Sequence, residues 1–236
     1  MSDCRPFHFK HFSLYHHRST MKVGTDAVLL GRWVDVKPTD SCLDIGTGCG
    51  IIPLMLMQKG VDRVDAIDLD EASIAEATEN FTASQWRDHL QAILMDVKDF
   101  NSEKLYDLIV SNPPFFINSF KCDADRKNQA RHTDISLTFT DLCESASRLL
   151  KKDGRFAVVL PVTESVAFLK AAENVGLFLR KEMNIIPVEG KEPNRVNLEL
   201  SFQNTENVVK EEFTIRQLNG CFTSQYNEFL KDFYLG

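Results

Sequence analysis

The stretch DIGTGCG, residues 44–50, contains the first residues whose types and spacing could do chemistry. Gly46, Gly48 and Gly50 allow a tight turn and a close approach of the backbone to a ligand. A helical stretch follows, and a helix N-terminus favours a negatively charged ligand group. The spacing is GxGxG, whereas dinucleotide-binding enzymes have GxGxxG. Taken alone, the loop is as consistent with a plain tight turn as with a ligand site.

Two acidic residues follow at the ends of successive apolar runs. Asp68, in AIDLD, lies about twenty residues after the loop, where a carboxylate can accept hydrogen bonds from a ribose diol. Asp96 closes QAILMD and is placed to meet the edge of an adenine. Each acid alone, like the neighbouring Asp70, is also explained as a solvated residue at a strand end. The order of loop and acids along the chain favours a cofactor that contains a nucleoside.

A stiff turn follows the apolar run YDLIV, in the sequence SNPPFF. Pro113 has a fixed φ, and Pro114 restricts the residue before it, so the turn around Asn112 is rigid. Neither proline supplies an N–H that competes for a backbone carbonyl. The turn is either a rigid element with Phe115 packed in a core or a preorganised substrate site. The cofactor-type motifs upstream favour the second reading.

Strands and helices alternate along the chain, and they must position these residues. Apolar runs predict strands near 41–46, 63–70, 91–96, 106–110 and 155–161, with helices near 51–60, 71–83, 136–154 and 163–176. The segments 177–188 and 195–203 predict an antiparallel hairpin. The fold class is therefore α/β, with a mostly parallel seven-stranded sheet, a C-terminal antiparallel hairpin and helices on both faces. We expect residues 1–40 to form an N-terminal extension that packs on a catalytic domain, residues 41–236.

In this order, DIGTGCG, AIDLD, MD and SNPPF resemble a class I S-adenosylmethionine-dependent methyltransferase that acts on amino groups. The resemblance implies a single Rossmann-like domain with S-adenosyl-L-methionine as cofactor. It implies that the glycine loop holds the methionine part of the cofactor, that Asp68 holds the ribose and that Asp96 contacts the adenine amino group. It gives Asp44 a less direct role in orienting the cofactor.

The same resemblance gives the SNPPF turn a catalytic role. In that family the target is a planar nitrogen, and the Asn112 side-chain oxygen and the Pro113 carbonyl would each accept one of its N–H groups. The nitrogen would then become pyramidal, with its lone pair directed at the cofactor's methyl group. Pro114 would keep the turn rigid, and Phe115 would stack on the target base, a contact of about 1–3 kcal/mol. Many family members have tyrosine at position 115, so we assign no role that needs a hydroxyl, and no general base.

The flanks are similar to the bacterial methyltransferases that modify N6 of adenine 37 in a valine tRNA. The similarity lies in MKVGTDAVLLGRW and RKNQARHT, and more loosely in NRVNLEL and FLKDFYLG. It implies tRNA, at the anticodon loop, as the partner. It also implies that Lys22, Thr25 and Asp26 cover the cofactor, although a helix cap would explain the last two as well. The expected RNA contacts are Arg126, Lys127 and Arg131, in a long polar loop that spans residues 117–137.

Other functions remain open from the sequence. A glutamine methyltransferase of release factors and a ribosomal-RNA guanine-N2 methyltransferase would share the chemistry of the SNPPF turn. A catalytically silent module that binds cofactor or RNA is a non-enzyme alternative, against which the intact glycine loop and Asn112 argue. A dehydrogenase is disfavoured by the GxGxG spacing.

Composition sets broader limits. The net charge of −7 argues against a protein that coats long nucleic acid, but permits a local basic rim. No apolar run is long enough to span a bilayer, so we expect a cytoplasmic protein without a membrane partner. Six scattered cysteines without a CxxC pair indicate free thiols, and no spacing predicts a metal site. We expect a monomer.

Overall fold

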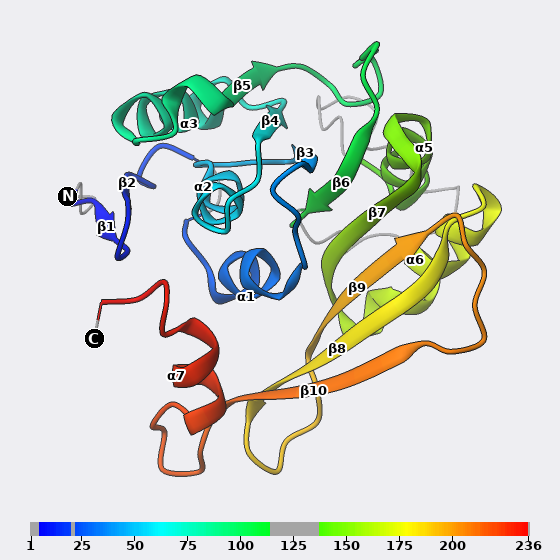
Figure 1. Cartoon of the computed structure of the whole chain (residues 1–236). Coiled ribbons are helices and arrows are strands. Elements are labelled where there is room, and N and C mark those ends of the chain that lie inside the picture. The colour runs from blue at the N-terminus through cyan, green and yellow to red at the C-terminus, as the bar shows by residue number, and fades with distance from the viewer. Residues whose placement is uncertain (1–4, 20–21, 114–136, 236) are drawn as a thin grey trace, which may run out of the picture.

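The computed structural model describes residues 5–19, 22–113 and 137–235 of the chain (Figure 1). Its centre is an eight-stranded sheet with the order β10-β8-β9-β7-β6-β3-β4-β5. The strands are β3 (Ser41–Ile45), β4 (Arg63–Asp68), β5 (Leu90–Leu94), β6 (Tyr106–Ser111), β7 (Leu150–Pro161), β8 (Phe178–Val188), β9 (Arg195–Ser201) and β10 (Val209–Arg216). Within this sheet β9 runs antiparallel to both of its neighbours, and the other pairs are parallel. The predicted α/β class and the β8–β9 hairpin are confirmed.

The sheet has one strand more than the seven predicted from the sequence. The additional strand, β10, pairs in parallel with β8 and forms the edge of the sheet beyond the hairpin. Its sequence, VKEEFTIR, carries four charged residues, and most of its side chains remain partly or fully exposed. An edge strand of this kind lacks the apolar run that identifies the buried strands.

Helices cover both faces of the sheet (Figure 1). The apolar core on one face includes residues of α1 (Thr25–Trp33), α2 (Ile51–Gln58), α3 (Glu71–Ala83) and α7 (Ser224–Leu230). The core on the other face includes residues of α5 (Phe139–Leu149) and α6 (Val162–Asn174). A 3₁₀ turn, η1 (Arg87–His89), precedes β5, and a small antiparallel pair, β1 (Phe7–His8) and β2 (Ser13–Leu14), lies near the N-terminus.

The central strands are apolar on both faces, which explains their continuous hydrophobic runs. In β7, Phe156, Val158 and Leu160 belong to the core beneath α5 and α6, whereas Ala157 and Val159 belong to the opposite core. All five side chains are at most 1% exposed. Strands buried on both faces are typical of parallel sheets between helical layers.

The predicted helix over 136–154 is shorter than expected. A capping box between Thr138 and Asp141 begins α5, which ends at Leu149. Leu150 then opens β7 and pairs with Tyr106 of β6. The basic residues that follow Leu150 suggested the end of a helix but belong to the strand.

The two ends of the described chain lie side by side. Phe9 forms an isolated antiparallel bridge with Tyr234, and the Lys10 N–H donates to the Phe233 carbonyl at 2.8 Å. None of the described helices is both long and apolar enough to cross a membrane. The described cysteines, Cys42, Cys49, Cys143 and Cys221, are free thiols.

Candidate active site

The described candidates from the sheet, which are the glycine loop, Asp68, Asp96 and Asn112, follow strands that flank the point where the strand order of the sheet reverses. The chain continues from β3 to β4 and β5 on one side, and β6 lies on the other side of β3. Ligands of open α/β sheets bind at the carboxyl ends of the strands at such a point. Ile45, the last residue of β3, pairs with Ser111, the last residue of β6, and the buried Ser111 hydroxyl donates to the Ile45 carbonyl at 2.7 Å. The glycine loop and Asn112 therefore leave the sheet next to each other.

The glycine loop adopts a backbone conformation that would be strained for residues with a side chain. Gly46, Gly48 and Gly50 have φ values of +76°, +54° and +83°. A Cβ atom on Gly50 would lie 2.4 Å from the Phe81 ring of α3, whereas a Cβ atom on Gly46 would meet nothing within 4 Å. Gly50 thus permits close packing of the loop on α3, and Gly46 borders open space that a ligand can enter.

Asp68, at the end of β4, supports the loop directly. Its Oδ2 accepts a hydrogen bond from the Gly48 N–H at 2.8 Å, and its Oδ1 accepts from the Asp70 N–H at 3.0 Å. A carboxylate has about four acceptor positions, so two remain for a diol. Asp70 caps α3 by accepting from the Ser73 N–H at 2.8 Å, so a structural role explains that acid.

Asp96 lies just beyond β5, beside apolar side chains that the sequence analysis missed. Its carboxylate pairs with the Lys98 ammonium at 3.2 Å and is largely buried. Leu69, Leu94 and Met95, which follow or end β4 and β5, are 40–50% exposed. An apolar surface next to two acids suits a nucleoside, whose ring needs apolar contact and whose polar edge needs acceptors. All three lie within the predicted strands 63–70 and 91–96, so residue type and spacing did not separate them from core residues.

Asp44 is the most unusual group in the loop. It is 1% exposed, and neither carboxylate oxygen has a hydrogen-bond partner among the described residues. Burial raises the pKa of Asp44 to about 7, and the charge of Asp68 adds to the rise, while the nearby Thr47 hydroxyl offsets part of it. The Thr47 Oγ1 is likewise buried without a partner within the described chain. A cationic or hydrogen-bonding ligand would supply what these atoms lack.

Asn112 carries the second unsatisfied group. Its side-chain oxygen is buried, and no described atom donates to it. Pro113, directly after it, is buried as well. The remaining predicted substrate-side residues lie outside the described residues: Pro114, Phe115, Arg126, Lys127 and Arg131.

The three predicted N-terminal cofactor residues lie at the start of α1. Lys22 and Thr25 are exposed, and Gly24 occupies the N-cap position without a side-chain cap bond, so Thr25 does not cap the helix. Asp26 accepts a hydrogen bond from the Arg195 Nε at 2.9 Å. Arg195 opens β9, and because β9 is antiparallel to β7, its first residue lies at the carboxyl edge of the neighbouring strands. This ion pair joins the start of α1 to that edge.

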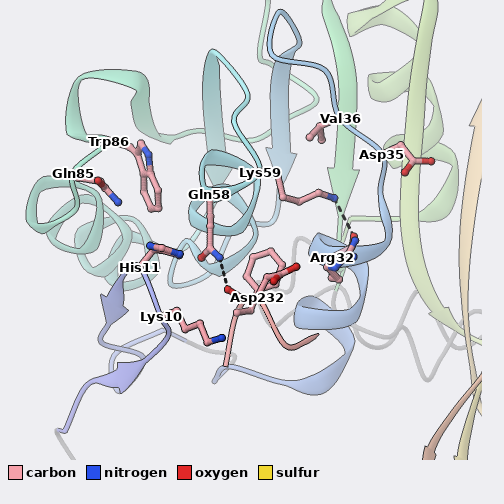
Figure 2. Close-up of a pocket in the computed structure, with 11 residues that line it drawn as sticks. Lys10, His11, Arg32, Asp35, Val36, Gln58, Lys59, Gln85, Trp86 and Asp232 are labelled. Atoms are coloured by element: carbon pink, nitrogen blue, oxygen red, sulfur yellow. Dashed lines mark hydrogen bonds between the residues drawn. The ribbon is translucent and has the colours of Figure 1, made fainter. Parts of the chain in front are cut away.

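A cavity of about 710 Å³ lies away from this site (Figure 2). Its wall includes Gln58 and Lys59 at the end of α2, which returns from the glycine loop to the opposite edge of the sheet. The Lys59 ammonium donates to the carbonyls of Gly31, Arg32 and Val34 at the end of α1. Gln58 donates to the Asp232 carbonyl at 2.8 Å, as Figure 2 shows. The Lys59 bonds join the ends of α1 and α2, and the Gln58 bond docks the C-terminal segment on α2, so both residues have a structural role.

Comparison with known proteins relates this site to a family. The methyltransferase small domain family matches residues 18–175. A protein from Phocaeicola vulgatus, curated as tRNA1(Val) (adenine(37)-N6)-methyltransferase, is 43% identical over 229 residues, which cover 97% of each chain. Proteins of the same name from Bacteroides thetaiotaomicron and Trichodesmium erythraeum are 36% and 39% identical, also over 97% of each chain.

Solved structures agree on the fold. A predicted O-methyltransferase from Agrobacterium tumefaciens superposes with a TM-score of 0.66 at 13% identity, covering 88% of this chain and 96% of that one. The 16S rRNA N2 G1207 methyltransferase of T. thermophilus, in complex with AdoMet and guanosine, superposes with a TM-score of 0.59 at 20% identity, covering 84% and 50%. The solved structures show a shared fold, whereas the family model and the sequence relatives show the family: the chain belongs to the methyltransferase small domain family.

Proposed function

We propose that this protein transfers a methyl group from S-adenosylmethionine to the exocyclic N6 of an adenine in tRNA, at position 37 of a valine tRNA. The relatives that carry this name are 36–43% identical to the chain over nearly its full length. One structural observation carries the chemistry: the Asn112 side-chain oxygen is buried and unpaired among the described residues, and it lies next to the glycine loop. A buried acceptor without a donor is costly in a folded protein, and a substrate amine supplies the missing donor.

The cofactor side fits S-adenosylmethionine by the chemistry of its groups. When bound, the cofactor supplies an electrophilic methyl group on a positively charged sulfur. Asp44 and Thr47 offer unsatisfied acceptors to the cationic end, and Gly46 leaves space for a close approach. Asp68 has acceptor positions left for a ribose diol, and Met95 belongs to the exposed apolar surface available to an adenine ring.

The substrate side works by orientation. An exocyclic amine is a poor nucleophile because its lone pair is delocalised into the ring. The Asn112 Oδ1 accepts one N–H of the amine and the Pro113 carbonyl accepts the other, which favours a pyramidal nitrogen. Since φ of Pro113 is fixed and Pro114 restricts the residue before it, the Pro113 carbonyl is held before substrate arrives. Fixed acceptors of this kind lower the barrier because they do not reorganise during the reaction. The nitrogen loses its proton to water after transfer.

An adenine next to the anticodon suits such a site. A base in a loop can be unstacked at a lower cost than a base in a duplex, so its amine can reach the edge of the sheet. Phe115, Arg126, Lys127 and Arg131 belong to this proposal as contacts for the base and for phosphates.

Nucleoside mass spectrometry on unmodified tRNA, incubated with the protein and S-adenosylmethionine, tests the proposal. We expect new N6-methyladenosine, located at position 37 of valine tRNA when purified tRNAs are compared. Asn112→Ala should reduce the rate by at least about 100-fold, as expected for loss of a transition-state hydrogen bond, with little change in cofactor affinity. Asn204→Ala, at an exposed asparagine remote in sequence, is the control.

Other products would redirect the proposal. If the product is N2-methylguanosine, the roles of Asn112 and Pro113 as acceptors stand, and the target base is guanine and not adenine. A methylated glutamine in a release factor, with no modified nucleoside, would move the substrate from RNA to protein. Equal losses of cofactor affinity and rate in Asn112→Ala would remove the assigned role of Asn112.

A further inference from the structure

A buried carboxylate on α3 holds the N-terminal arm, residues 15–19, against the body of the protein. Glu76 is 0% exposed. Its Oε1 accepts hydrogen bonds from the backbone N–H groups of His17 and Arg18 at 2.9 and 3.0 Å, and its Oε2 accepts from that of Ser19 at 2.9 Å. Burial alone would raise the pKa of Glu76, but these backbone donors hold it below its ordinary value. The arm is thus bound through its main chain, one turn of α3 before Asn80.

Asn80 connects the same arm to the glycine loop. Its side chain is 2% exposed, accepts from the Tyr15 N–H at 2.8 Å and donates to the Tyr15 carbonyl at 2.8 Å. The same amide nitrogen donates to the Cys49 carbonyl at 2.8 Å, inside the DIGTGCG loop. One buried amide therefore bonds both to the arm and to the cofactor loop.

The arm leads into the residues expected over the cofactor. The Val23 N–H donates to the His16 Nδ1 at 3.1 Å, so the chain at Val23 stays close to the arm. The helix α1 begins two residues later at Thr25, and Asp26 in its first turn is paired with Arg195. The segment 22–26 is consequently fixed at two places, by the arm on the α3 side and by Arg195 on the β9 side.

Fold stabilisation alone does not explain this choice of residues. Burying a carboxylate is expensive, and an apolar contact would bind an irregular segment to a helix at lower cost. Hydrogen bonds to three successive N–H groups fix the position of the backbone. Apolar packing is not directional and fixes that position less closely.

We propose that Glu76 and Asn80 are positioning residues for cofactor binding: they hold the N-terminal arm against the glycine loop so that residues 22–26 close over the cofactor. The inference rests on the proposed function, because it assumes that the cofactor occupies the glycine-loop site. Neither residue touches the reacting atoms, so their loss acts on cofactor affinity and not on the methyl-transfer step.

Cofactor affinity and transfer rate, measured separately, test this role. The variants Glu76→Gln and Asn80→Ala are compared with Glu79→Gln on the same helix, an exposed residue that pairs with Arg18 of the same arm. The dissociation constant for S-adenosylmethionine, by titration calorimetry well below the unfolding temperature, should rise about 10–100-fold in the first two, the loss typical of a buried charged hydrogen bond. It should change less than about twofold in Glu79→Gln.

The methyl-transfer rate separates positioning from a purely structural role. At saturating S-adenosylmethionine, both test variants should recover the wild-type rate to within about twofold, because lost uniform binding raises KM without lowering kcat. Unchanged cofactor affinity together with a lower unfolding temperature would overturn the inference, as would a loss of kcat that saturation does not restore. Asn80→Ser, which keeps a polar side chain, replaces Asn80→Ala if that variant does not fold.

Failure of the proposed function gives a different result. If wild-type protein binds S-adenosylmethionine but does not methylate tRNA, the calorimetric comparison still decides the role of Glu76 and Asn80. If wild-type protein does not bind S-adenosylmethionine, the cofactor assignment and this inference both fall.

Discussion

Replacing Asp44 with asparagine should change the pH dependence of stability in a way that reports directly on the candidate cofactor loop. Asp44 is buried, its oxygens have no partner among the described residues, and its pKa is about 7. The ordinary value for the group is 3.8, so the folded protein holds a proton that the unfolded chain has already released between those two pH values. The free energy of unfolding therefore falls as the pH rises from about 4 to about 7.

The size of the effect follows from the two pKa values. Each pKa unit corresponds to about 1.4 kcal/mol, so the charged carboxylate costs the folded state up to about 4 kcal/mol above pH 7. Most of that cost develops above pH 5, where the difference between wild type and Asp44→Asn should widen by roughly 2–3 kcal/mol up to pH 8. Below both pKa values the carboxyl is neutral in both states and this contribution disappears.

Urea unfolding of both proteins at several pH values between 5 and 8 measures the difference. Asp99→Asn, at an exposed acid, is the control and should follow the wild type throughout. Any cost of burying the asparagine amide is independent of pH. The test is therefore the change with pH in the difference between the unfolding free energies of wild type and Asp44→Asn. A difference between wild type and Asp44→Asn that stays flat from pH 5 to pH 8 would refute the reasoning. The variant should also bind S-adenosylmethionine more weakly, since the cationic cofactor loses a carboxylate partner.

Four further substitutions test the loop and the opposite edge of the sheet. Asp68→Ala should weaken S-adenosylmethionine binding about 10–100-fold in calorimetry, since a charged acceptor is lost, and unchanged affinity would mean that another acid holds the ribose. Gly46→Ala should destabilise the protein by about 1–2 kcal/mol through backbone strain alone. Gly50→Ala should cost about 1–3 kcal/mol more than Gly46→Ala, because the Phe81 ring must also move. Equal losses of stability in urea unfolding would contradict this packing. Burial lowers the pKa of Lys59 to about 8, and the charge of Arg32 contributes to this shift. The free energy of unfolding should therefore rise by up to about 3 kcal/mol between pH 8 and pH 10.5. Lys59→Met should remove that rise.

The elements beneath the site were predictable because each carries a local signal. The helix α3 spans residues 71–83 as predicted, since Asp70 caps it and Glu71 lies in its first turn. The parallel strands were recognisable from apolar runs that the two cores require. The α5 boundary was wrong because Leu149 and Leu150 are both buried, one in a helix and one in a strand, and local pattern does not separate them.

Contacts between distant segments were not predictable from one sequence. Glu76 reads as an ordinary acid in the middle of a helix, and its importance depends on an arm about sixty residues earlier in the chain. The pairing of Asp26 with Arg195 spans 169 positions. Leu69 and Met95 read as the ends of core strands, although they remain exposed at the edge of the sheet. Residue type and spacing singled out candidate ligand-facing groups, but not the groups that hold them in place.

The reversal of strand order between β3 and β6 has an evolutionary consequence. The described cofactor-side candidates follow β3, β4 and β5, whereas Asn112, the proposed amine acceptor, follows β6. The Ser111 hydroxyl at the end of β6 donates to the Ile45 carbonyl at the end of β3, between the two sets. A lineage can therefore acquire a new target by replacing the chain after β6 while it inherits the cofactor half unchanged. The same boundary is a natural crossover point for laboratory chimeras: exchange of the segment after Pro113 between family members should transfer target preference and leave S-adenosylmethionine affinity at the level of the recipient.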